Sequence, residues 1–239
     1  MIVLRDVNKT YGRRTVVRGL TFTIRTGTAF GLLGQNGAGK TTTMKMLVGL
    51  VRPSSGEVTV GGRPVDDPAA RERIGFMPEA PYFYERLTGL EFMRFCSELF
   101  EHRSRDTAGC EKLLERVGLL SAARRPIATY SKGMKQRLGF AQALVNDPEY
   151  LFLDEPLDGL DPLGRREMKD IIRGLRAEGR TIFFNSHILY DTEALCDEVG
   201  IIHNGELIAR GTVADIARGK PLEERFVEIV LAHRMTAQV

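Results

Sequence analysis

Hydrophobic residues recur along this chain with two different spacings. Between residues 16 and 24 they alternate with polar residues, as in a half-buried strand, and Thr28–Leu33 is a short apolar run that ends at a glycine. From Lys40 to Leu50 the spacing becomes helical, with Met44, Leu47 and Val48 on one face. The pattern predicts strands and turns up to about residue 78, helices over roughly 82–147, and alternating strands and helices beyond.

Local signals place the ends of several elements. Thr88 and Glu91 have the spacing of a capping box, and apolar residues follow at helical intervals, namely Phe92, Phe95, Cys96 and Leu99. A further helix begins at Ser131, and Asn204-Gly205 between two apolar runs predicts a tight hairpin. Strands linked by helices favour an α/β fold with parallel strands at its centre.

Composition narrows the function classes. The 239 residues carry 34 basic and 31 acidic side chains, a net charge of +3 that is too even to indicate nucleic-acid binding. The three cysteines are widely spaced and suggest reduced thiols in a cytosolic protein. The first residues enter a strand pattern without a signal peptide, and no apolar stretch approaches the roughly 18 residues of a membrane span. If the protein serves a membrane, we expect a partner chain to cross it.

The strongest chemical motif is Gly34-Gln-Asn-Gly-Ala-Gly-Lys-Thr41, between a predicted strand and a predicted helix. Its glycines let several backbone N–H groups point into one concavity, and the helix adds the positive end of its dipole. Lys40 can then reach the β- and γ-phosphates of a nucleotide, and the Thr41 hydroxyl can bind Mg²⁺. An ordinary glycine-rich turn is the competing interpretation.

Two acids and a histidine follow later strands. Asp154 and Glu155 come directly after the apolar run Tyr150–Leu153, where Asp154 can orient Mg²⁺ and Glu155 can polarise an attacking water. Many strands simply end in solvated charges, so this motif depends on the phosphate loop for its meaning. His187 follows the strand Thr181–Asn185 and could contact the γ-phosphate, although a histidine there is often only a surface residue.

Together these strings resemble the nucleotide-binding subunit of an ABC transporter over essentially the whole chain. Gly34–Thr42 is similar to the Walker A loop of that family, Leu151–Glu155 to Walker B, and Tyr130–Gln136 to its signature motif. Gly159–Asp161 resembles the D-loop, and Asn185–His187 the switch histidine. The signature is the discriminating string, because P-loop kinases and GTPases lack it.

The resemblance implies an ATP- and Mg²⁺-dependent ATPase with a P-loop NTPase core, a mainly parallel central sheet, an antiparallel β subdomain near the N-terminus and an inserted helical subdomain. The α/β core would comprise residues 1–81 and 148–219, the helical signature subdomain 82–147, and a short C-terminal tail 220–239. The implied catalytic residues are Glu155, His187 and Lys40, and the implied metal ligands are Thr41, Glu79 and Asp154. The implied nucleotide-binding residues are Tyr11, which would stack on adenine, and Gly34, Asn36, Gly37, Ala38, Gly39, Lys40, Thr41, Thr42, Ser131 and Gly133.

The resemblance also implies partners. Two copies would pack head to tail around two ATP molecules, with Ser131 and Gly133 of one copy facing the nucleotide of the other. Without that ligand, Ser131 is a plain helix N-cap. A separate integral-membrane permease would be driven by the dimer, which would lie on the cytoplasmic face of the cell membrane.

Two positions depart from the usual family pattern. Glu79 stands where a glutamine normally contacts Mg²⁺, and Lys132 stands where glycine is commoner in the signature. With Leu157-Asp158 they favour the ATPases of ABC-2-type exporters. The alternative is a non-transport ABC ATPase that acts as a mechanical or regulatory module at the membrane. A soluble ABC ATPase of the repair, chromosome or translation type would carry coiled coils, zinc modules or a second cassette, which this sequence does not show.

Overall fold

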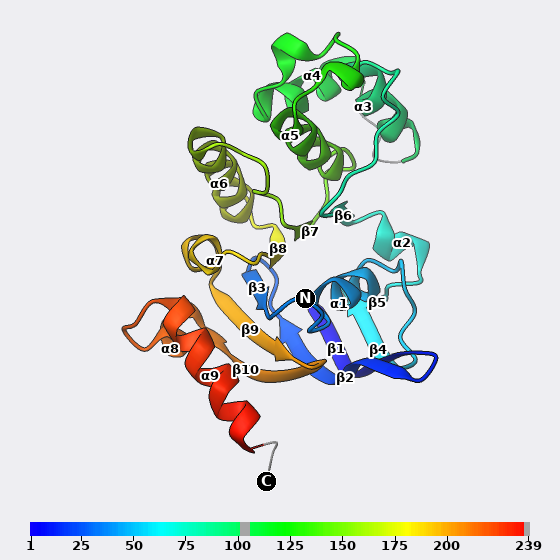
Figure 1. The fold of residues 1–239 in the computed structure, drawn as a ribbon. Helices are drawn as coiled ribbons and strands as arrows, with labels where there is room; N and C mark the ends of the chain where they lie inside the picture. The colour runs from blue at the N-terminus through cyan, green and yellow to red at the C-terminus, as the bar shows by residue number, and fades with distance from the viewer. Residues whose placement is uncertain (101–105, 237–239) are drawn as a thin grey trace. The chain divides into compact units, whose positions relative to one another are not determined.

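The computed structural model describes residues 1–100 and 106–236, which form two compact units (Figure 1). The first unit comprises Met1–Arg71 and the chain from Thr181 onward, and the second comprises Glu72–Arg180. The second unit is therefore an insertion in the sequence of the first. The predicted helical subdomain, residues 82–147, falls within the second unit.

An antiparallel sheet is built from the N-terminal part of the first unit. Its strands are β1 (Ile2–Tyr11), β2 (Arg14–Ile24), β4 (Ser55–Val60) and β5 (Arg63–Pro64), in the order β2-β1-β4-β5. Gly61 and Gly62 both have positive φ, of 63° and 80°, and form the turn between β4 and β5. The antiparallel β portion expected near the N-terminus is thus confirmed.

Parallel strands form the centre of the first unit. β3 (Ala29–Leu33) lies between β8 (Thr181–Asn185) and β9 (Glu198–His203) and is parallel to both. All five residues of β3 and of β8 are buried, as expected for strands covered on both faces. β10 (Glu206–Thr212) pairs antiparallel with β9 through the turn Asn204-Gly205, whose φ angles of 50° and 85° confirm the predicted hairpin.

Helices of the first unit follow its strands. α1 (Lys40–Leu47) comes after β3 and the glycine-rich loop, α2 (Pro68–Arg71) after β5, and α7 (Leu189–Leu195) after β8. α8 (Val213–Ala217) and α9 (Leu222–Thr236) end the described chain, and α9 packs against α7, α8 and β10 (Figure 1). The region expected to be a short tail is therefore a helix of 15 residues.

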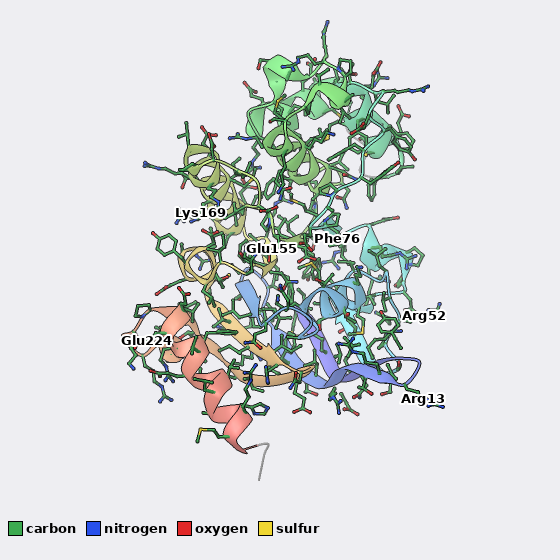
Figure 2. All side chains as sticks on the ribbon, in the orientation of Figure 1. Arg13, Arg52, Phe76, Glu155, Lys169 and Glu224 are labelled. Atoms are coloured by element: carbon green, nitrogen blue, oxygen red, sulfur yellow. The ribbon has the colours of Figure 1, made fainter. Side chains whose placement is uncertain are left out.

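The second unit joins two parallel strands to a group of helices. β6 (Ile74–Met77) pairs with β7 (Tyr150–Asp154), and Figure 2 labels Phe76 on β6 and Glu155 just after β7. The helices are α3 (Gly89–Glu98), α4 (Thr107–Arg116), α5 (Lys132–Ala143) and α6 (Pro162–Ala177), with single turns at η1 (Leu120–Ala122) and η2 (Ile127–Thr129). α3, α4 and α5 pack against one another.

The predicted capping box at the start of α3 is present. Thr88 Oγ1 accepts a hydrogen bond from the Glu91 N–H at 3.2 Å, and Glu91 Oε2 accepts one from the Thr88 N–H at 2.8 Å. The predicted apolar face is only half buried: Phe92 and Cys96 are covered, whereas Phe95 and Leu99 are 41% and 67% exposed. Helical spacing identifies a face, but the neighbouring elements decide how far around the helix that face is covered.

Burial raises the pKa of Cys96 to about 12, so this thiol stays protonated at neutral pH.

No helix within residues 1–100 and 106–236 combines the length and apolarity needed to cross a lipid bilayer.

Gly205 provides a test of how tightly the β9–β10 turn packs. A Cβ atom at Gly205 would lie 2.4 Å from the Val16 carbonyl oxygen, whereas one at Gly179, which also has a positive φ, would meet nothing within 4 Å. Gly179→Ala should lower the free energy of unfolding by the ~1–2 kcal/mol of a strained left-handed residue. Gly205→Ala should lower it by a further ~1–3 kcal/mol, because the backbone must move. Urea denaturation of both variants measures the difference, and equal losses would contradict the close contact.

Candidate functional site

The glycine-rich loop Gly34–Thr41 joins the buried strand β3 to the start of α1. Gly39, the N-cap of α1, has φ 111°, a conformation that residues with a side chain rarely adopt. A Cβ atom at Gly34 would lie 2.5 Å from the Ile202 carbonyl oxygen of β9. The loop therefore needs glycine at these two positions for different reasons, one conformational and the other a close approach to β9.

Hydrogen bonds hold the loop in its curled form. The ammonium of Lys40 donates to the carbonyl oxygens of Gly34 and Gln35, at 2.6 and 3.2 Å. The Ala38 N–H donates to the Gln35 carbonyl at 3.1 Å, and the Gly205 N–H of the β9–β10 turn donates to the Ala38 carbonyl at 3.0 Å. The hairpin turn is thus one of the supports of the loop, which sequence reasoning did not foresee.

Residues beyond the first glycine remain accessible. Gln35, Asn36, Gly37 and Thr41 are exposed, while Thr42 is half-buried and Ala38 is buried. The loop opens at the N-terminus of α1, where backbone N–H groups lack partners within the helix and attract anions. A phosphate group fits this arrangement of exposed backbone, lysine and helix terminus.

His187 lies in the same pocket as the loop. This pocket has a volume of about 480 Å³ and is lined by Leu33, Gly34, Gln35, Asn36, Ser186, His187, Leu189 and Phe226. The His187 side chain is exposed, and the Ser186 hydroxyl accepts a hydrogen bond from the Ile188 N–H at 3.0 Å, which shapes the turn that carries the histidine. The first unit thus brings together the loop and the histidine, which are about 150 residues apart in the sequence.

Tyr11 ends β1, and its ring is 49% exposed. The ammonium of Lys9 lies 4.8 Å from the ring centroid on one face. An exposed aromatic ring of this kind can stack on a nucleotide base.

In the second unit, Asp154 and Glu155 occupy the end of β7. Asp154 is the last residue of the strand and is 4% exposed, and Glu155 follows with φ 52°, an unusual value for a residue with a side chain. The Gln136 amide of α5 donates to the Glu155 carbonyl at 2.8 Å. The helix with the signature motif therefore holds the backbone of Glu155, although Gln136 was not among the predicted site residues.

The signature motif forms the start of α5. Ser131 is the N-cap of the helix, and its hydroxyl accepts a hydrogen bond from the Met134 N–H at 3.2 Å. Gly133 faces the segment after Glu155, because a Cβ atom there would lie 3.4 Å from the Gly159 carbonyl oxygen. A Cβ atom at that distance makes an ordinary van der Waals contact, so packing against Gly159 does not require glycine at position 133.

The unusual Lys132 has a partner in the same segment. Its ammonium lies 2.7 Å from a carboxylate oxygen of Asp158. The stem of the lysine crosses Gly159, where a Cβ atom would lie 2.7 Å from the Lys132 Cδ and Cε atoms. A cation in the first turn of a helix opposes the helix dipole, and the carboxylate of Asp158 offsets the charge of Lys132 there.

Glu79 follows β6 and is exposed. It lines a second pocket of about 480 Å³ together with Tyr130, Lys132, Gln136 and Asp158, among other residues. This position places a carboxylate beside the signature helix within the second unit.

The candidate metal ligands come from both units, Thr41 from the first and Glu79 and Asp154 from the second. Among the described residues, no three or more His, Cys, Asp or Glu side chains gather into a group that could hold a metal ion. Thr41, Asp154 and Glu79 supply the oxygen atoms that Mg²⁺ prefers, and such sites usually complete their shell with water and substrate phosphates. The donor chemistry fits a magnesium ion that arrives with a nucleotide.

Comparisons with known proteins identify the family to which this chain is similar. The family model described as "ABC transporter" matches residues 17–158. An uncharacterised ABC transporter ATP-binding protein of Nostoc sp. is 48% identical over 203 residues, which are 84% of this chain and 61% of that protein. A fluoroquinolones export ATP-binding protein of Mycobacterium tuberculosis is 46% identical over 195 residues, 81% of this chain and 64% of the relative. The chain thus spans less than two thirds of the length of either relative.

A solved structure described as the ATP-binding subunit of an ABC transporter has a TM-score of 0.88 and 32% identity, and covers 96% of this chain and 99% of its own. The likeness confirms the predicted P-loop fold with parallel and antiparallel strands. Together with the match to the family model over more than half of the sequence, it shows that the chain belongs to the ABC transporter family, among the ATP-binding proteins of that family.

Proposed function

We propose that this chain binds ATP with Mg²⁺, hydrolyses it, and thereby drives a separate membrane permease of the ABC-2 exporter type. The observation that carries the proposal is the loop Gly34–Thr41. Its residues Gly34, Gln35 and Asn36 line one pocket with His187, and the loop continues through Lys40 into the N-terminus of α1. Each part favours binding of an anionic phosphate chain.

Binding would begin at the loop. Lys40 exchanges its contacts with the loop carbonyls for the β- and γ-phosphates, and the N–H groups at the start of α1 bind phosphate oxygens. Tyr11 stacks on the adenine ring with its exposed face. Thr41, Asp154 and Glu79 would hold Mg²⁺, which neutralises charge on the β- and γ-phosphates when bound.

Hydrolysis needs a base, and Glu155 is the carboxylate proposed for it. Glu155 accepts a proton from water while the water oxygen bonds to the γ-phosphorus. The bond from the γ-phosphorus to the β–γ bridging oxygen breaks, and ADP leaves with that electron pair. Lys40 and His187 stabilise the charge that develops on the γ-phosphate oxygens. The hydrogen bond from Gln136 to the Glu155 carbonyl fixes the backbone that carries the base.

The complete site would need a second copy of the chain. The N-terminus of α5, capped by Ser131 and open at Gly133, would face the γ-phosphate bound to the partner copy. Homodimers are the commonest soluble assemblies, and a head-to-tail pair of cassettes closed by ATP accounts for the bare backbone at Gly133.

Transport is proposed from the names of relatives. The Mycobacterium tuberculosis relative is described as a fluoroquinolones export protein, which supports export rather than import. We propose that the chain acts on the cytoplasmic face of a membrane, beside a permease that selects the substrate.

The proposed base gives a direct test. Glu155→Gln keeps the size of the side chain but removes its basicity, so we expect ATP to bind and turnover to fall by about 10²–10³-fold. We also expect the variant to accumulate as a dimer with ATP, which size-exclusion chromatography measures. Glu57→Gln, at an exposed carboxylate of β4, serves as the control and should leave turnover unchanged. Undiminished turnover in Glu155→Gln would show that another group acts as the base.

The phosphate loop gives a second test. Lys40→Ala should weaken ATP binding by about 10- to 100-fold, the range for loss of a charge-assisted hydrogen bond. Lys45→Ala removes an exposed lysine from the same helix and should bind ATP normally. Isothermal titration calorimetry of both variants with MgATP separates the two residues, and equal affinities would count against the loop as the phosphate site.

The permease is tested in the cell that makes the protein. We expect an affinity-tagged chain to copurify with a multi-span membrane protein, and the pair in vesicles to move a substrate only when ATP is supplied. Binding to a membrane protein without ATP-dependent movement of any substrate would favour a regulatory module instead.

A further inference from the structure

The C-terminal helix α9 shares an apolar cluster with the strand that leads into the phosphate loop. Leu222 and Val230 of α9 are buried in one apolar cluster with Leu33, the residue directly before the loop. Leu189, at the start of α7 and two residues after His187, packs against the same cluster. Figure 1 shows α9 beside β10 and α8 in the first unit. The helix thus contacts the helix after the histidine and shares its buried cluster with the strand before the loop.

A second contact joins the far end of α9 to the loop itself. Arg234 Nη2 donates a hydrogen bond to Gln35 Oε1 at 2.8 Å, across 199 residues of sequence. The neighbouring His233 places its ring edge-on against His203 at the end of β9, with 5.8 Å between centroids. Burial, followed by the coulombic effect of Arg234 and His233, lowers the pKa of His203.

Phe226, two helical turns before Arg234 on α9, lines the same pocket as His187 and the first residues of the loop. The side of α9 toward the loop therefore carries the Phe226 ring in its first half and the Arg234 guanidinium near its C-terminal end. Glu224, labelled in Figure 2, is exposed near the start of the helix.

Gln35 is held from two directions. Its backbone carbonyl accepts from Lys40 Nζ at 3.2 Å and from the Ala38 N–H at 3.1 Å, and its side-chain oxygen accepts from Arg234. Gln35 is exposed, so little packing would hold it without these bonds. A shift of Gln35 therefore moves the carbonyl oxygen that accepts a hydrogen bond from Lys40.

We infer that Arg234 is a positioning residue for the nucleotide site: through its hydrogen bond to the Gln35 side chain, α9 sets the conformation of the phosphate loop and so its affinity for ATP. This inference rests on the proposed ATP-binding function. Arg234 acts through Gln35 and need not touch the nucleotide. The region that the sequence suggested to be a tail is thereby part of the nucleotide site.

A different role for Arg234 would be direct attraction of the phosphates by its charge. The two roles differ in their dependence on Gln35. If Arg234 acts through Gln35, removing the arginine has no further effect once the Gln35 amide is gone. If it acts by its own charge, the loss is the same in either background, and it weakens as salt screens the attraction.

The experiment is a double-mutant cycle on the full chain. Arg234→Ala, Gln35→Ala and the double variant are titrated with MgATP by calorimetry, and their ATP turnover is measured. Arg234→Lys keeps the charge and can still donate to Gln35, so it should retain most of the affinity. Arg218→Ala removes an exposed positive charge at the end of α8 and serves as the matched control. Thermal unfolding of each variant checks that the chain stays folded.

We expect Arg234→Ala to weaken ATP binding by about three- to tenfold, the range for one lost hydrogen bond. Gln35→Ala and the double variant should weaken it by the same factor, KM for ATP should rise in step, and kcat should stay within about twofold, since Glu155 is untouched. Unchanged affinity in Arg234→Ala, or losses that multiply in the double variant, would overturn the inference and leave the proposed function standing. Failure of the unmodified chain to bind ATP would instead overturn the proposed function and this inference with it.

Discussion

The close approach of the phosphate loop to β9 is the constraint on which the candidate site depends. Gly34 lies where any side chain would collide with the Ile202 carbonyl, and the Gly205 N–H on the next turn donates to the Ala38 carbonyl inside the loop. The loop therefore packs against the C-terminal end of β9 and the β9–β10 turn. Because β9 pairs directly with β3, the strand that enters the loop and the strand that supports it belong to one hydrogen-bonded sheet. Such support matters because a loop that presents bare backbone to a ligand has few side-chain contacts of its own.

In the second unit, contacts with a neighbouring segment likewise support the signature helix α5. Lys132, Gly133 and Gln136 lie in the first turn and a half of α5, and each lies against the segment from Glu155 to Gly159. An ion pair, van der Waals packing and an amide hydrogen bond thus join the helix N-terminus to the chain that carries the proposed base. Lys132 is unfavourable in the first turn when considered alone, and Asp158 explains why it is tolerated there. The positive φ of Glu155 is held by this surrounding structure.

The C-terminal helix α9 also contacts the phosphate loop, although it contains none of the sequence motifs. Its apolar face packs into the cluster that contains Leu33, and its end reaches Gln35 through Arg234. The proposed nucleotide site consequently responds to a helix that carries no recognised motif. α9 offers a physical route from the C-terminal region of the described chain to the loop.

The sequence by itself determined what is local. The loop motif, the capping box at Thr88, the N-cap at Ser131 and the Asn204-Gly205 turn each depend on a few neighbouring residues, so their patterns predicted them. Only the tertiary structure decided which distant groups meet: Arg234 with Gln35, Gly205 with Ala38, and Lys132 with Asp158. It also decided that Phe95 and Leu99 stay exposed, whereas Phe92 and Cys96 of the same apolar set are buried. The reason is that periodicity records which side of an element is apolar, whereas the partner of an exposed side chain, and the edge of each buried face, depend on elements far away in the sequence.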